Sequence, residues 1–103
     1  MPILIDGLSP TEYATLWGDE SADGGLLYNY GSEQQEYTAE YLTALLAAID
    51  RTIEKVKGWL KSINAEVPQD NNRRMVRLAY EEDLRNLPLL REHVAAELAD
   101  VSR

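Results

Sequence analysis

The sequence predicts a mainly α-helical fold: a long antiparallel helical hairpin, with a short N-terminal helix and an irregular or short-strand N-terminal segment packed across it. Two stretches of apolar residues at spacings of three and four predict the two long helices. A polar turn around Pro68 separates them, and 103 residues have room for one domain, 1–103. Within it, 1–31 form the N-terminal arm, short helix and loop, 32–64 the long helix, and 73–101 the second helix.

The N-terminal third contains one short helix between less regular segments. Residues 2–6 (PILID) are apolar and β-branched, which favours an edge strand or an extended arm. Ser9, Pro10 and Glu12 form a capping box with proline at the first helical position, so a short helix begins there. Its expected buried stripe is Tyr13, Leu16 and Trp17. Residues 26–30 (LLYNY) fit either a strand or an ordered coil.

The long helix has the strongest pattern in the chain. Ser32 and Gln35 have the spacing of a second capping box, which predicts that the helix begins at 32. Apolar residues then recur at alternating spacings of four and three over three heptads, as in a coiled-coil seam. These positions are Leu42, Leu46, Ile49, Ile53, Val56, Leu60 and Ile63. Gly58 interrupts good helix formers, so it either permits a close helix crossing or ends the regular part.

The second helix follows a turn at 64–72 and repeats the spacing at Tyr80, Leu84, Leu87, Val94, Leu98 and Val101. Arg91 occupies a position where an apolar residue is expected. Pro88 lacks a backbone donor and crowds the carbonyl of the residue four positions earlier, so a kink or break is expected there. Residues 73–78 (RRMVRL) fit either the first turns of this helix or a short strand.

Charge divides the chain into two unequal halves. The sequence has 18 acidic and 10 basic residues, for a net charge of −8. Residues 1–50 contain nine acids and no Lys or Arg, whereas 51–103 contain nine acids and all ten basic residues. Three interpretations remain open: a solubilising acidic surface, an acidic face that meets a basic partner, and head-to-tail association of copies.

Composition disfavours several classes of protein. The longest apolar run, 44–49, has six residues and is far too short for a membrane span. No basic region opens the chain, so we expect no signal peptide, no membrane partner and a cytoplasmic location. Cysteine is absent, which excludes disulfides and thiolate metal sites. A net acidic chain is also a poor general binder of nucleic acid.

Catalytic chemistry has little support in the sequence. His93 is the single histidine and is expected to be a partly exposed surface residue. Glu36 and Glu40 are one turn apart, but the Glu-x-x-His pair of di-iron bundles is missing. No glycine-rich phosphate loop is present either. The sequence therefore predicts a protein that is not an enzyme, with no catalytic or metal-binding residues and no cofactor.

Three groups of residues are candidate contact surfaces. An acidic, tyrosine-rich face comprises Tyr28, Tyr30, Glu33, Glu36, Tyr37, Glu40 and Tyr41; the alternative is that these tyrosines seal the N-terminal third onto the hairpin. A possible oligomer seam comprises Leu42, Leu46, Ile49, Ile53, Val56 and Leu60; the alternative is that these residues pack only against other parts of the same chain. A possible basic patch comprises Arg51, Lys55, Arg73, Arg74 and Arg77.

These features favour a protein that binds other proteins over an enzyme. The first hypothesis is a small helical subunit that oligomerises, as a dimer or more, or docks in a larger assembly. The alternative is a small acidic inhibitor, of the type that phages use against host defences, that binds a basic and often nucleic-acid-binding surface of a partner protein. A third, a helical factor that contacts nucleic acid through the basic patch, is disfavoured by the net charge of −8.

Overall fold

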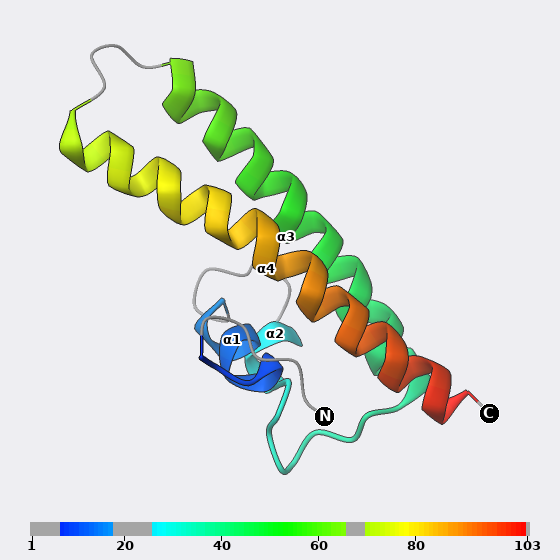
Figure 1. The fold of residues 1–103 in the computed structure, drawn as a ribbon. Coiled ribbons are helices and arrows are strands. Elements are labelled where there is room, and N and C mark those ends of the chain that lie inside the picture. The colour runs from blue at the N-terminus through cyan, green and yellow to red at the C-terminus, as the bar shows by residue number, and fades with distance from the viewer. Residues whose placement is uncertain (1–6, 18–25, 66–69, 103) are drawn as a thin grey trace.

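The computed structural model describes residues 7–17, 26–65 and 70–102 and shows a long helix pair with two short helices at one end (Figure 1). The elements are α1 (Pro10–Leu16), α2 (Leu26–Asn29), α3 (Ala39–Ala65) and α4 (Asn71–Val101). The long helices pack antiparallel in a molecule about 51 Å long. The predicted mainly helical fold, with its long hairpin, is confirmed.

Among the described residues, the two segments that also fitted a strand are helical. Residues 26–29 form a single helical turn, α2, and 73–78 lie inside α4. Residues 2–6, the other proposed strand, lie outside the described residues. Residues 73–78 continue the apolar spacing of α4 towards its cap at Asp70, and α2 packs on α3 as part of a helical layer and not as a strand.

The capping box predicted for α1 is present. The Glu12 amide donates to the Ser9 hydroxyl oxygen at 3.3 Å, and the Ser9 amide donates back to the Glu12 carboxylate at 3.4 Å. The helix ends at Leu16, with Trp17 as its C-cap. Leu16 itself was wrongly assigned to the buried stripe, because it is exposed and Ala14, on the neighbouring face, is buried in its place.

The long helix begins at Ala39 and not at 32, which corrects the sequence-based start. Ser32 does accept a hydrogen bond from the Gln34 amide at 3.3 Å, but this closes only a local turn. The cap is Thr38, whose hydroxyl oxygen accepts from the Tyr41 amide at 3.1 Å. Residues 35–38 stay non-helical, which lets Tyr37 reach back to the Gly31 amide.

The second helix runs unbroken from Asn71 to Val101, so of the kink or break expected at Pro88 the break is absent (Figure 1). It begins two residues before the expected 73, because Asp70 caps it by accepting from the Arg73 amide at 2.9 Å. A proline inside a helix costs about 3 kcal/mol. Leu87 and Leu90, which flank Pro88 and have no exposed surface, offset that cost by packing in the core.

One core joins all four helices. The largest side chains with essentially no exposed surface are Tyr30, Leu27, Leu42, Leu45, Ile49, Leu87, Leu90, Val56 and Val94. Tyr13 and Ala14 bring α1 into the same cluster. Burying each large side chain contributes roughly 1.5–3 kcal/mol, so the N-terminal segment is a third layer of the fold, as the sequence predicted.

Candidate interaction surfaces

Three tyrosines of the predicted acidic face stack on one another inside the molecule. The rings of Tyr30 and Tyr37 lie 5.3 Å apart, and those of Tyr37 and Tyr41 are stacked at 5.9 Å. Tyr30 also meets His93 of α4 edge to face at 6.3 Å. The stack therefore joins the segment after α2 to both long helices. This agrees with the alternative in which these tyrosines hold the N-terminal third against the hairpin.

Each of these hydroxyl groups has a partner within the chain. Tyr30 donates to the Glu97 carboxylate at 2.7 Å, and Tyr41 donates to the Leu26 carbonyl at 2.7 Å. Tyr37 accepts from the Gly31 amide. Burial, followed by the hydrogen bond to Glu97, raises the pKa of Tyr30, and burial raises the pKa of Tyr37 and Tyr41 above the usual range for phenols.

The group around Glu97 was not among the sites predicted from the sequence. His93 Nε2 lies 3.0 Å from the same Glu97 oxygen that accepts from Tyr30, while the other oxygen of Glu97 is buried without a hydrogen bond in the described structure. The spacing of His93 and Glu97, one helical turn apart, was a visible signal. Their shared partner Tyr30 comes from 67 residues earlier in the chain, which no local pattern predicts.

The remaining members of the acidic face are available at the surface. Tyr28 is 57% exposed, and Glu33, Glu36 and Glu40 are all exposed. Beside Tyr28 lies an open hollow of about 350 Å³ between α1 and the end of α2, lined mainly by Thr11, Glu12, Thr15, Tyr28 and Ser32. The tyrosine-rich face is thus divided into a buried stack and an exposed acidic rim.

The predicted oligomer seam is largely used within the chain. Leu42, Ile49 and Val56 have no exposed surface, whereas Leu46, Ile53 and Leu60 are half-buried. The buried stripe of α3 has a slightly different register, since Leu45 and Thr52 are buried as well. The Thr52 hydroxyl donates to the Ala48 carbonyl at 2.8 Å, so this polar side chain is satisfied without leaving the helix.

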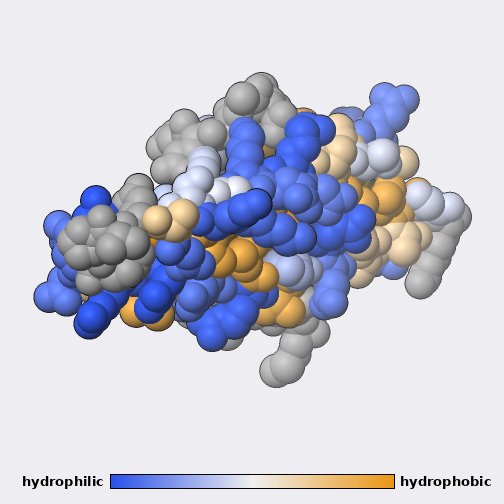
Figure 2. All heavy atoms as spheres, turned by 90° about the horizontal axis from the view of Figure 1, so that it is seen from above, coloured by the Kyte–Doolittle hydropathy of each residue, from blue (hydrophilic) through white to orange (hydrophobic). Residues whose placement is uncertain are grey.

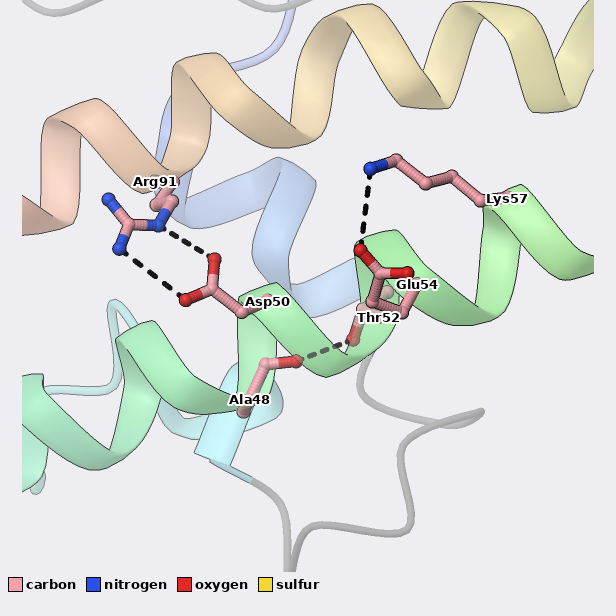
Figure 3. Close-up of polar contacts among 6 residues, drawn as sticks. All are labelled: Ala48, Asp50, Thr52, Glu54, Lys57 and Arg91. Carbon is pink, nitrogen blue, oxygen red and sulfur yellow. Dashed lines mark hydrogen bonds and ion pairs between the residues drawn. The ribbon is translucent and has the colours of Figure 1, made fainter.

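A salt bridge joins the long helices on the side away from α1 and α2 (Figure 3). The Arg91 guanidinium donates to the two Asp50 oxygens at 2.7 and 3.4 Å, and this raises the pKa of Arg91. Arg91 was the polar residue found where the periodicity expected an apolar one. Because both side chains are about half exposed, the pair contributes roughly 1 kcal/mol or less.

The hairpin extends beyond the part that α1 and α2 cover. We define its distal half as residues 57–65 and 70–82. Large apolar side chains are exposed there, namely Trp59 (38%), Met75 (70%), Val76 (37%) and Leu78 (57%). The Trp59 ring packs on Tyr80 at 5.7 Å, the outermost aromatic contact of the described chain. The space-filling view shows hydrophobic residues at the surface between hydrophilic ones (Figure 2).

The predicted basic patch is only partly assembled. Arg73, Arg74 and Arg77 lie together on the first turns of α4, while Arg51 and Lys55 lie nearer the middle of α3. Arg73 pairs with Asp70 at 2.9 Å, and Arg77 lies 3.9 Å from Glu81. Arg74 is exposed and pairs with no acid in the described structure.

The two ends of the described molecule differ in charge. The distal half has five basic and three acidic residues, a balance of +2. Residues 7–17, 26–56 and 83–102, which form the base, have four basic and ten acidic residues, a balance of −6. The fold therefore keeps much of the charge separation of the sequence, because the described acids of residues 7–50 all lie at the base.

Within the described residues, no cluster of three His, Asp or Glu side chains is arranged to hold a metal ion, and no helix is long and apolar enough to cross a membrane. No known family model matches the chain, and comparison with characterised proteins and with solved structures found no similar protein.

Proposed function

We propose that this protein acts through contacts with other protein chains and not by catalysis, as a small helical subunit that associates with further copies of itself. One observation carries the proposal: a third layer covers one end of the hairpin, while the apolar side chains of the distal half stay exposed. The exposed apolar side chains of the base, Leu16, Tyr28, Leu89 and Val101, are spread over α1, α2 and the second half of α4, whereas Met75, Val76 and Leu78 lie within four consecutive residues of α4.

The chemistry of the distal half supports an interface over a merely solvated helix pair. Exposed apolar side chains that gather at one place are typical of protein contact sites, and tryptophan, methionine and arginine are enriched in such sites. Met75 and Leu78 lie one turn apart on α4, and Arg74 lies beside Met75. A small domain gains further core by association, which fits a hairpin with one open end.

The proposal is tested by the mass of the purified chain across a concentration series, by light scattering after size exclusion. Association should give a species of at least twice 11.6 kDa. The double variant Met75→Glu/Leu78→Glu should remain a monomer, because it places charges on exposed positions of the contact without removing core side chains.

A matched control is Leu89→Glu, which puts the same charge on an apolar residue of α4 that is 37% exposed but lies at the base. This variant should associate as the unchanged protein does. A protein that stays at monomer mass at every concentration would refute self-association. A Met75→Glu/Leu78→Glu variant that associates normally would instead refute the distal half as the contact.

A second candidate function is an acidic inhibitor that occupies a basic surface of another protein. The specific support is the exposed acidic rim at the base, formed by Glu33, Glu36 and Glu40 beside Tyr28. Affinity capture from cells would test it, with the variant Glu33→Lys/Glu36→Lys/Glu40→Lys as comparison. A basic partner that binds both forms equally would exclude this acidic rim as its contact.

A further inference from the structure

We propose that the distal half of one copy docks on the acidic base of a second copy, beside Tyr28, so that copies associate head to tail. This inference rests on the self-association proposed above and names the surface that the second copy supplies. The base is identified by its charge and by the hollow next to Tyr28, and the distal half by its exposed apolar and basic side chains.

The distal half offers a cation, Arg74, that forms no ion pair with the described acidic residues. Arg74 is exposed and unpaired in the described structure, and the adjacent Met75 is 70% exposed. Arg73 and Arg77, by contrast, already face Asp70 and Glu81 on the same helix. Arg74 and Leu78, one turn apart on the same face of α4 and both exposed, therefore present a guanidinium next to an apolar side chain, a combination common at the centre of protein interfaces.

The base offers a site of matching chemistry. Its hollow of about 350 Å³ is large enough for one long side chain, and its lining includes the exposed Tyr28, the acidic Glu12 and the hydroxyl-bearing residues Thr11, Thr15 and Ser32. A guanidinium is attracted to an aromatic face and forms strong hydrogen bonds with carboxylates and hydroxyl oxygens. We therefore assign Arg74 of one copy to the hollow of the next.

Charge decides how the copies are oriented. Two distal halves brought together would oppose surfaces of +2 each, and two bases would oppose surfaces of −6 each. Only a contact between the distal half of one copy and the base of another brings opposite charges together. Opposite charges also speed the diffusional encounter of the two copies. The two surfaces lie towards opposite ends of a molecule about 51 Å long, so the contact must join two chains. Such a heterologous contact repeats and produces rings or open filaments.

Two full-length variants test the arrangement by mixing. One has a blocked distal half, Met75→Glu/Leu78→Glu, and the other a blocked base, Tyr28→Ala/Glu33→Gln/Glu36→Gln. Every altered residue is exposed, so circular dichroism should show both variants folded. Each variant alone should be a monomer. An equal mixture should give a dimer that does not grow further, because each chain supplies one functional surface.

The possible failures separate the two proposals. If the unchanged protein is a monomer at all concentrations, both proposals fail. If it associates but the blocked-base variant associates equally well, self-association stands and the head-to-tail contact is wrong. A mixture of the two variants that stays monomeric also overturns the head-to-tail contact.

Two further measurements probe the chemistry of the contact. Arg74→Gln should weaken association at least about tenfold, while Lys57→Gln, which removes a cation already facing Glu54, should change it little. Raising the salt from about 0.05 to about 0.5 M should also weaken association markedly, because salt screens attraction between exposed charges. Salt-independent association would contradict charge as the orienting force.

Discussion

The Tyr30 hydroxyl donates a hydrogen bond of 2.7 Å to the Glu97 carboxylate, joining the segment after α2 to the last turns of α4. The two residues are 67 positions apart in the chain. Tyr30 is essentially fully buried, and its ring contacts both Tyr37 and His93. This contact, with the Tyr13 hydroxyl that donates to Asp83 at 2.8 Å, fixes where the N-terminal layer sits on the hairpin.

Replacing Tyr30→Phe should lower the free energy of unfolding by about 1–3 kcal/mol. The substitution keeps the ring but removes the hydroxyl, which leaves the Glu97 oxygen without this donor in a half-buried place. Urea unfolding followed by circular dichroism measures the change. The control is Tyr28→Phe, since Tyr28 is 57% exposed and should tolerate the loss within about 0.5 kcal/mol. Equal effects at both positions would contradict a stabilising role for the contact.

Stability should fall at alkaline pH because of the buried tyrosines. Burial raises the pKa of Tyr30 and Tyr41 in the folded chain above the value of about 10 for an unfolded chain. Both groups stay protonated in either state below pH 10, so their contribution to stability is complete there. Above that pH the unfolded chain releases protons more readily, and the contribution is lost as the pH rises towards the folded pKa.

This alkaline transition is measurable by following phenolate absorbance and helical circular dichroism on the same samples. Part of the phenolate signal should appear only together with the loss of helix. Complete ionisation of all six tyrosines while the helical signal is unchanged would contradict the burial of the stack.

Patterns of near neighbours predicted the helices well, but long-range contacts decided their ends. The capping box at Ser9 worked because both of its partners lie within one turn. The same signature at Ser32 failed because Tyr37 turns back to Gly31 and stacks on Tyr30, which holds residues 35–38 out of the helix. Such a contact depends on where two distant segments meet, and spacing along the chain does not encode it.

The candidate surfaces, like the helix ends, were predicted from the sequence only as far as they depend on near neighbours. Alternating spacings of three and four correctly placed Leu42, Ile49 and Val56 on the apolar side of α3, but they do not say whether a second chain or α4 covers them. The exposure of Met75 and Leu78 also depended on how far the N-terminal layer reaches along the hairpin. Charge was more informative, since the described acids of the first half of the sequence all lie at the base.

Alanine should have opposite effects at two glycines. Gly31 has a positive φ of 93°, and a Cβ there would lie 2.6 Å from the Thr11 Cβ of α1. Gly31→Ala should therefore destabilise the protein by more than about 1 kcal/mol, from backbone strain and the steric clash. Gly58 lies inside α3 with open space around it, so it neither ends the helix nor permits a close crossing.

Gly58→Ala should stabilise the protein by about 0.5–1 kcal/mol, because alanine loses less backbone entropy in a helix. The two variants are compared by urea unfolding under the same conditions. A stabilised Gly31→Ala variant would mean that the turn after α2 does not approach α1 as closely as the structure shows.

Replacing Pro88→Ala should stabilise the protein by about 1–3 kcal/mol. Pro88 is exposed in the middle of α4, and alanine restores a backbone donor for the Leu84 carbonyl without removing a buried side chain. The matched control is Pro10→Ala at the first position of α1, where the missing donor costs nothing and the proline is buried. That variant should be neutral or destabilised in the same urea unfolding assay. A Pro88→Ala variant less stable than the unchanged protein would instead show that the proline shapes α4 to fit the N-terminal layer.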